Sequence, residues 1–227
     1  GYSEEEGERL RRDDEPVQNK LGLKNLETGE TETLDGVDSF TFSPDGAYLA
    51  LRRYAVQGPG GGENSDEVGP GRTILIRELA TGRDMTFGNV AQFAWQNVDD
   101  SHLLAMVISA EDNLGNGVHL YDAETSQLRV LDSSESDYQN LVWREGSDDL
   151  AVMRGRAQDG KEGLTQAVLR WTGLESGGSL KTFDPTASPG FPEGLRIVPF
   201  RPLSWSADGE LLFLGLAEWA DQTPESV

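Results

Sequence analysis

The amino-acid sequence predicts an all-β fold, a β-propeller built from four-stranded antiparallel blades, and three observations support this prediction. Apolar residues alternate with polar ones at the spacing of half-buried strands. Tight-turn sequences separate these short strands. One strand–turn–strand segment, residues 40–51, recurs along the chain at intervals of about 50 residues, which is typical of propeller repeats. A β-sandwich, the alternative all-β fold, does not predict the same hairpin at the same phase of each repeat.

The recurring segment has the chemistry of a β-hairpin. Phe40 and Phe42 alternate with polar residues, which predicts a strand with one buried face. Pro44 presets φ for the first turn position, and Asp45 can accept hydrogen bonds from the backbone ahead of it. Gly46 can adopt a positive φ, so the chain can reverse there into a second apolar strand.

Copies of this hairpin give the chain its predicted order. The turn glycines Gly29 and Gly82 are 53 residues apart. The aromatic residue at the hairpin corner recurs at Phe42, Trp95, Trp143 and Trp205, at spacings of 53, 48 and 62 residues. We call the four strands of a blade a to d in chain order. The chain then begins with strands c and d of one blade, continues through three complete blades, and ends with strands a and b of another. That order amounts to four blade-equivalents.

Domain boundaries follow from the repeats. Residues 1–18 form a polar, mixed-charge lead-in, and the predicted propeller covers residues 19–227. We expect a half-blade at 19–35, blades at about 38–88, 90–132 and 138–184, and a half-blade at 200–217. Known propellers have about 4–8 blades. We expect an arc of a larger propeller, because both ends fall inside a blade; the alternative is a small ring closed by pairing the two half-blades.

The predicted loops divide between two faces. The tight a–b and c–d turns lie on one face, and the b–c and d–a connections lie on the other. Two long connections, residues 55–71 with their glycine-rich stretch and residues 184–201 with four prolines, fall on the second face. Because loops carry function more often than scaffolds do, we expect recognition there. A glycine-rich surface excursion without a binding role is the alternative.

Composition excludes several classes of function. The chain of 227 residues has 40 acidic and 19 basic side chains, and its net charge is −21. We therefore expect no nucleic-acid partner and no anionic membrane surface, since both require clustered Lys and Arg. Either an acidic soluble surface or adaptation to high salt explains the charge. There is no cysteine, no apolar run near the ~20 residues of a membrane span, and no targeting segment, so the sequence assigns no compartment.

The sequence predicts no catalytic, cofactor-binding or metal-binding residue in this chain. A Gly-x-Ser-x-Gly nucleophile motif is absent. His102 and His119 lie on predicted strands without a linked Ser and Asp, so we expect packed or surface histidines rather than a triad or metal ligands. Residues 58–62 are rich in glycine but lack the Lys-Ser/Thr of a phosphate-binding loop.

Three acidic clusters offer oxygen ligands of the kind that bind calcium. Asp99-Asp100 and Asp148-Asp149 stand where the a–b turn belongs, so turn chemistry explains them. The loop of residues 112–116, with Asp112, Asn113 and Asn116, is a weak calcium candidate. None of the three has the spacing of an EF-hand loop.

Two copies of the corner carry a resemblance to a known family. The residues Phe42-Ser43-Pro44-Asp45-Gly46 and Trp205-Ser206-Ala207-Asp208-Gly209 resemble the Pro-Asp type of WD-like propeller repeat. Such repeats occur in the N-terminal propeller of the prolyl oligopeptidase and dipeptidyl peptidase IV-like serine peptidases, and in TolB-like proteins. The uneven repeat lengths and the long glycine-rich insertion resemble the peptidases more closely. The copies at Trp95 and Trp143 lack the proline.

The resemblance implies a function outside catalysis. In that family the propeller restricts access to an α/β-hydrolase domain, so this chain is expected to be a non-enzymatic gate and scaffold whose partners are that hydrolase domain and a peptide substrate. Some members hold the substrate amine with paired glutamates, but we do not assign this role to Glu4, Glu5 and Glu6, which lie outside the repeats. The alternatives are a TolB-like propeller that binds a protein partner through its long-loop face, and a stand-alone four-bladed ring that binds a small ligand.

Overall fold

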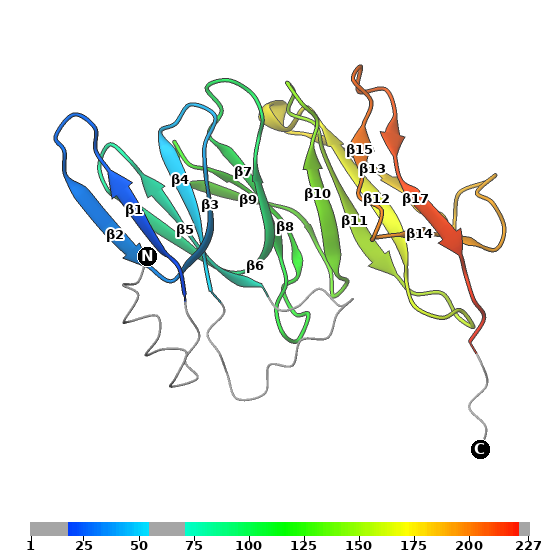
Figure 1. The fold of residues 1–227 in the computed structure, drawn as a ribbon. Coiled ribbons are helices and arrows are strands. Elements are labelled where there is room, and N and C mark those ends of the chain that lie inside the picture. The colour runs from blue at the N-terminus through cyan, green and yellow to red at the C-terminus, as the bar shows by residue number, and fades with distance from the viewer. Residues whose placement is uncertain (1–17, 55–70, 223–227) are drawn as a thin grey trace, which may run out of the picture. The chain divides into compact units, whose positions relative to one another are not determined.

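A computed structural model describes residues 18–54 and 71–222 of the chain, and its regular structure is almost entirely β-strand (Figure 1). The all-β prediction is therefore confirmed. The described residues contain one short 3₁₀ helix, η1 (Leu174–Ser176), and no helix long and apolar enough to cross a membrane. They belong to two compact units, with residues 18–54 and 72–88 in the first and residues 71 and 89–222 in the second.

The sheet β10-β11-β12-β13 shows the predicted blade most completely. Its strands are β10 (Tyr138–Trp143), β11 (Leu150–Arg156), β12 (Thr165–Thr172) and β13 (Ser179–Phe183). They pair in chain order, and every pairing is antiparallel. Four consecutive antiparallel strands form one propeller blade, so the predicted fold class is confirmed.

A seven-stranded sheet contains the two preceding blades. It runs in the order β3 (Val37–Phe42), β4 (Tyr48–Arg53), β5 (Arg72–Glu78), β6 (Asp84–Trp95), β7 (Leu103–Ile108), β8 (Gly117–Asp122) and β9 (Gln127–Ser133). Strand β6 is long enough to be the last strand of one blade and the first strand of the next. Asn89, at the change of blade, has a positive φ of 57°. The chain thus passes between blades without a loop, where the repeats alone suggest two separate strands.

Both ends of the described chain are half-blades. At the start, β1 (Lys20–Lys24) pairs with β2 (Thr31–Asp35) in a sheet of their own. At the end, β15 (Ser204–Trp205) pairs with β16 (Leu212–Phe213), and β14 (Leu195–Val198) pairs with β17 (Gly215–Glu218). These four strands form one hairpin, interrupted where residues 199–203 bulge opposite the single residue Leu214.

One loop prediction was wrong. Residues 184–201 were expected to be a long connection, but β14 lies within them and pairs with β17 over four residues. Prolines at 192 and 199 suggested a loop. They stand outside the strand, where the missing N–H disturbs no ladder hydrogen bond. The other long connection, residues 55–71, lies outside the described residues except for Gly71.

The corner turn repeats in atomic detail. The Ser43 hydroxyl accepts from the Tyr48 N–H at 2.9 Å and donates to the Asp45 carboxylate, which accepts from the Ala47 N–H at 3.1 Å. The Ser206 hydroxyl makes the equivalent bonds to the Leu211 N–H, at 2.9 Å, and to the Asp208 carboxylate. Gly46 and Gly209 both have a φ of 71°. The sequence motif therefore encodes one specific hydrogen-bonded turn.

Each unit has its own core. In the first unit, Leu49 and Leu51 of β4 are fully buried and pack with Leu34 of β2 and Leu21 and Leu23 of β1. Arg77 of β5 ties the same two sheets together. It pairs with Glu32 of β2 at 2.6 Å and with Asp84 of β6 at 2.7 Å, and its side chain is 10% exposed. These charges raise the pKa of Arg77 further above its ordinary value, so the guanidinium is permanently charged.

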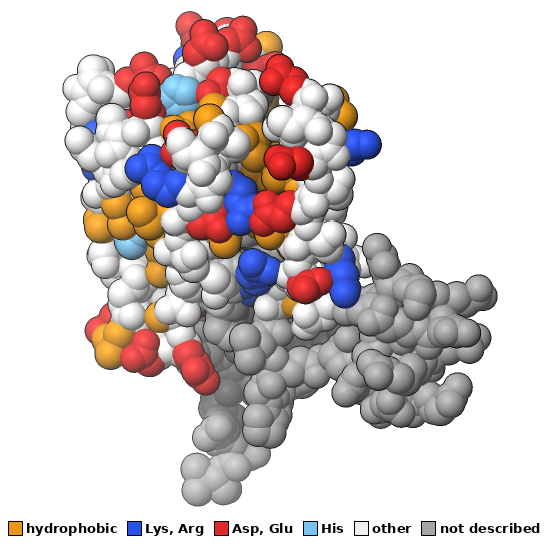
Figure 2. All heavy atoms as spheres, turned by 90° about the vertical axis from the view of Figure 1, so that its left-hand side faces the viewer, with side chains coloured by type: hydrophobic (Ala, Val, Ile, Leu, Met, Phe, Trp, Pro, Cys, Tyr) orange, Lys and Arg blue, Asp and Glu red, His pale blue; other side chains and the backbone are white. Residues whose placement is uncertain are grey.

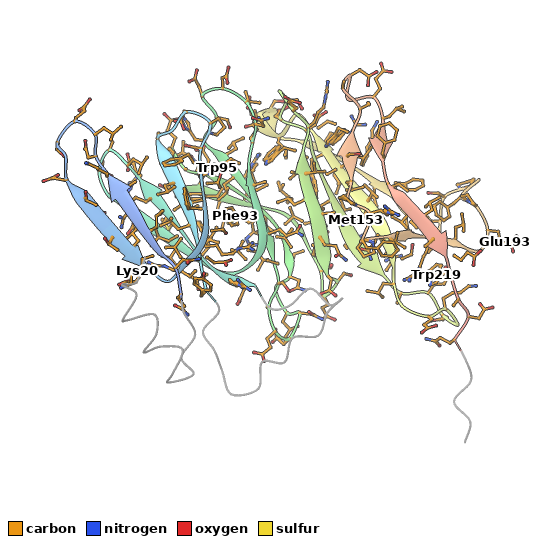
Figure 3. The ribbon with its side chains drawn as sticks, in the orientation of Figure 1. Lys20, Phe93, Trp95, Met153, Glu193 and Trp219 are labelled. Atoms are coloured by element: carbon orange, nitrogen blue, oxygen red, sulfur yellow. The ribbon has the colours of Figure 1, made fainter. Side chains whose placement is uncertain are left out.

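In the second unit, tryptophans join successive blades. The Trp143 indole N–H donates to the Ala94 carbonyl oxygen of the preceding blade at 2.9 Å, and the Trp205 indole donates to Val142 at 3.4 Å. The guanidinium of Arg170 lies over the Trp205 ring, 5.3 Å from its centroid. Apolar side chains fill the space between, including Met153 of β11, whose side chain is visible in Figure 3. Buried area and directed hydrogen bonds thus act on the same boundary between blades.

The indole bond predicts the effect of Trp143→Phe. The substitution removes the hydrogen bond to Ala94 and a small apolar area, and we expect the free energy of unfolding to fall by about 1–2 kcal/mol. Trp171→Phe is a matched control, because Trp171 is 3% exposed and its indole has no hydrogen-bond partner among the described residues. Urea unfolding measures both variants. Equal losses in the two variants would show that the indole bond contributes nothing.

Tyr138 predicts how stability depends on pH. The side chain is 1% exposed, and its hydroxyl donates to Asp132 at 2.6 Å. Burial and this carboxylate raise the pKa of Tyr138 from 10.0 to about 12. Between these values the unfolded chain has lost the proton and the folded chain keeps it. The contribution of Tyr138 to stability is therefore fully present below pH 10 and is lost as the pH rises towards 12. We expect a loss of about 2–3 kcal/mol in chemical unfolding at these pH values, largely absent in Tyr138→Phe.

Candidate functional site

A depression of about 390 Å³ lies within the second unit. It lies where the tight turns of the β6–β9 blade meet the short helix η1 of the next blade. Its lining residues are Asp100, Ser101, His102, Leu103, Leu120, Asp122, Glu124, Gln127, Arg129, Leu174 and Glu175. The hollow therefore belongs to the turn face, not to the long-loop face where recognition was expected.

Local turn chemistry shapes the outer wall. The Asp122 carboxylate, at the end of β8, accepts hydrogen bonds from the Glu124 and Thr125 N–H groups at 3.0 and 3.1 Å. Ser126 then takes a φ of 58°, which closes the turn into β9. The Ala123 N–H donates to the His102 carbonyl oxygen at 3.0 Å, so this c–d turn is tied to the a–b turn beside it. The two turns hold one wall as a unit.

Gln96 forms a buried bridge behind the depression. It occupies the position after the corner aromatic, where Ser43 and Ser206 stand in other copies, and it is fully buried. Its amide nitrogen donates to the Ser147 carbonyl oxygen at 3.2 Å and to the Glu175 carboxylate at 3.1 Å, both in the next blade. The Ser101 hydroxyl donates to the Gln96 carbonyl oxygen. One side chain thus holds two blades and one acidic wall residue in place.

The lining is predominantly acidic. Four carboxylates, those of Asp100, Asp122, Glu124 and Glu175, face the same hollow as Arg129 and His102. The Arg129 guanidinium donates to the Leu174 carbonyl oxygen at 2.7 Å, and His102 Nε2 lies 4.0 Å from the Glu124 carboxylate. A cationic group would be favoured here over an anionic one.

The arrangement does not activate a nucleophile. The hydroxyl of Ser101 is committed to Gln96. His119 lies on β8, where burial lowers its pKa and favours the neutral ring. Within residues 18–54 and 71–222, His119 has no serine or carboxylate hydrogen-bond partner, and no group of three His, Asp or Glu side chains is placed to hold a metal ion. The described geometry offers polar binding and no recognisable reaction centre.

The acidic clusters weighed for calcium are used within the fold. Asp100 has a φ of 61° in its turn, and Asp149 lies 3.4 Å from Arg144 and 3.7 Å from Arg170. In the loop of residues 112–116, Asp112 accepts from the Leu114 N–H at 3.1 Å. Fully buried Asn116 binds the backbone N–H of Ala110 at 2.7 Å. Glu4, Glu5, Glu6 and residues 58–62 lie outside the described residues.

Several lining residues gave no signal in the sequence. Gln127, Arg129 and Glu175 belong to no motif, and only the packing of one blade on the next brings Glu175 to this wall. Gln96 did give a signal, because it stands where Ser43 and Ser206 stand in two of the other corners. A longer amide at a buried position predicts a partner farther away than the turn itself.

Comparison with known proteins gives structural likeness only. No family model and no curated protein matches the chain. Among solved structures, the β-propeller domain of the trilobed protease from Pyrococcus furiosus is 16% identical with a TM-score of 0.47, over 82% of this chain and 52% of that one. TolB from Acinetobacter baumannii is 16% identical with a TM-score of 0.45, over 86% and 42%. A structure from a study of two prolyl endopeptidases is 15% identical with a TM-score of 0.48, over 88% and 28%.

These structures are of the classes that the sequence resemblance names. This chain spans about half of their length or less. The antiparallel pairing of β10, β11, β12 and β13 in chain order establishes the blade fold without them.

Gln96→Leu tests the bridge behind the depression. The substitution keeps the volume but leaves the Ser147 carbonyl, the Glu175 carboxylate and the Ser101 hydroxyl without this partner. We expect the free energy of unfolding to fall by about 2–4 kcal/mol, measured by urea unfolding. Gln158→Leu, at an exposed position, is the control and should change stability by less than about 0.5 kcal/mol. A Gln96→Leu protein as stable as the control would contradict the assigned role.

Proposed function

We propose that this chain is the non-catalytic propeller region of a serine peptidase, which gates access of peptides to a hydrolase domain and scaffolds that domain. The corner turn carries the proposal. Ser43 with Asp45 and Ser206 with Asp208 form the same hydrogen-bonded turn after an aromatic residue. The Pro-Asp repeat therefore encodes this turn. The same repeat resembles those of the prolyl oligopeptidase propellers.

The contacts between blades support a gating role. A gate must resist opening between its blades, and in the second unit each boundary has directed bonds. Trp143 and Gln96 join the β6–β9 blade to the β10–β13 blade. Arg144 donates to the Asp208 carbonyl oxygen at 2.8 Å and joins the β10–β13 blade to the last hairpin. Opening any boundary would break bonds that are partly shielded from water, which costs more than breaking surface contacts.

The proposal places peptide hydrolysis outside these residues. Ser101, the serine beside His102, is bonded to Gln96, so the described site offers no nucleophile–base pair from which acyl transfer could begin. The acidic depression and the net charge of −21 suit a role in attracting cationic peptides. Such a surface can bind some peptides and exclude others without catalysing a reaction.

Active-site labelling tests this division of labour. We expect purified chain of residues 1–227 to hydrolyse no chromogenic dipeptide and to take no label from a fluorophosphonate, which modifies activated serines. The protein expressed from the complete gene should take the label on a serine outside residues 1–227. Labelling of the 227-residue chain, or no label on the complete protein, would overturn the proposal.

Gating is tested separately in the complete protein. Gln96→Leu loosens one blade boundary and should raise kcat/KM for peptides of about 30 residues while leaving kcat/KM for a dipeptide unchanged, because only the longer substrate needs the boundary to open. Gln158→Leu is again the control. Equal changes for both substrates would indicate a general loss of structure and would count against a gate.

A further inference from the structure

The carboxylates that face the depression have no arginine partner, unlike other carboxylates of the second unit. Asp132 pairs with Arg154 at 2.9 Å, and Asp149 pairs with Arg144 at 3.4 Å. The carboxylates of the depression are those of Asp100, Asp122, Glu124 and Glu175. Within residues 18–54 and 71–222, none of these four forms an ion pair with Lys or Arg, and Glu124 approaches only the His102 ring. The depression is therefore a place where negative charge is left unbalanced.

Two of these carboxylates are held in position with one oxygen left over. The Gln96 amide donates to Glu175 Oε1 at 3.1 Å, and the Glu175 N–H donates to the Asp148 carboxylate at 3.0 Å. Both backbone bonds to Asp122 use Oδ1. Among the described residues nothing donates to Glu175 Oε2 or Asp122 Oδ2. A cationic ligand would find these oxygens already oriented, which lowers the cost of binding it.

The inner side of the depression is apolar and has an unused hydrogen-bond donor behind it. Leu103, Leu120 and Leu174 line this side, and Leu103 is partly exposed. Trp171 packs with Leu120 and Leu174 in one core cluster and is 3% exposed, and its indole N–H has no acceptor among the described residues. Buried N–H groups rarely lack an acceptor. A ligand with a carbonyl oxygen, such as a peptide, would supply one.

We propose that the depression binds the side chain of an arginine residue in a peptide, with its guanidinium on Asp122 and Glu175 and a peptide carbonyl oxygen facing Trp171. A guanidinium has five N–H donors in one plane and can bind several carboxylate oxygens at once. The methylene groups of the side chain pack on the leucines. The depression of about 390 Å³ is of the size of small-ligand sites, which span ~300–1,000 Å³.

Arg129 lines the depression but does not fill this role. Its guanidinium donates to the Leu174 carbonyl oxygen at 2.7 Å and pairs with none of the four carboxylates. With His102 neutral, four carboxylates against one guanidinium leave a net charge of −3 on the lining. Figure 2 shows Asp and Glu side chains gathered at the upper end of the view, the end at which the β6–β7 turn lies in Figure 1. Such a field attracts cations and speeds their association.

The two parts of the proposal have different foundations. That the ligand is a peptide rests on the proposed function, whereas the guanidinium rests on the lining alone. The tests below use the 227-residue chain and no hydrolase domain. A failure to bind would therefore leave the labelling test of the peptidase proposal untouched, and a negative labelling result would leave the guanidinium site standing.

Titration with two matched ligands tests the charge requirement. N-acetyl-arginine amide, added to isotope-labelled chain at neutral pH and low salt, should bind with a Kd of about 0.1–1 mM, as expected for a ligand with few heavy atoms. N-acetyl-citrulline amide has nearly the same shape without the charge and should bind at least tenfold more weakly. Equal affinities for the two ligands, or no binding of the arginine ligand, would overturn the proposal.

Glu175→Gln tests the assigned carboxylate. The variant keeps an acceptor for the Gln96 amide but loses the charge, and we expect the Kd for N-acetyl-arginine amide to rise at least fivefold. Glu135→Gln is the matched control, because it removes the same charge at an exposed position that does not line the depression, and it should change the Kd less than twofold. Equal effects of the two variants would show that only the overall charge matters and would contradict the proposal.

The indole N–H signals in the nuclear magnetic resonance spectrum locate the ligand. The Trp171 signal is identified by its loss in Trp171→Phe, and it should move during the titration. The Trp219 indole donates to the Glu162 carbonyl oxygen at 2.9 Å, and neither residue lines the depression, so its signal should stay in place. Movement of the Trp219 signal with a stationary Trp171 signal would place the ligand elsewhere and would overturn the proposal.

Discussion

The structure depends on how one blade is held to the next, because a single twisted blade cannot bury both of its faces. In the second unit one structural position does this. The corner tryptophans Trp143 and Trp205 end a strand and also donate to a carbonyl oxygen of the preceding blade. A residue that closes a hairpin therefore also fixes the spacing between blades. Since backbone carbonyls accept these bonds, the contact constrains the strand itself and not merely a side chain.

The residue after the corner aromatic takes one of two roles. Ser43 and Ser206 make their side-chain hydrogen bonds within their own turn. Gln96 and Arg144 stand at the same position and reach the next blade. In these two copies the side chain keeps a bond within its own hairpin, to Ser101 or to Asp149, and adds a bond to the next blade. The added bond constrains the receiving turn, because a Cβ on Gly209 would lie 1.9 Å from the Arg144 guanidinium.

The fold was predictable from the sequence, and the candidate site largely was not. Strand period and turn chemistry are local properties of the sequence. The pattern of Phe42, Asp45 and Gly46 therefore predicts a hairpin at each place where it recurs. The passage of β6 through Asn89 and the strand β14 depend on pairing with distant segments, which no local pattern records. The depression needs two blades to be in contact before it exists. Gln96 was the available clue, since a longer amide replaces the serine that Ser43 and Ser206 place in their turns, and the Gln96 side chain is fully buried.

The contacts that join sheets and blades differ from surface ion pairs in how strongly salt weakens them. A chain with a net charge of −21 repels itself over its surface, and surface ion pairs weaken as salt rises. The indole bonds of Trp143 and Trp205 involve no charged group, so salt screening leaves them intact. At Arg77, where a charge joins two sheets of the first unit, the side chain is only 10% exposed and is held by two carboxylates. Burial limits the screening there, which lets an acidic protein retain one ionic link between its first half-blade and its first blade.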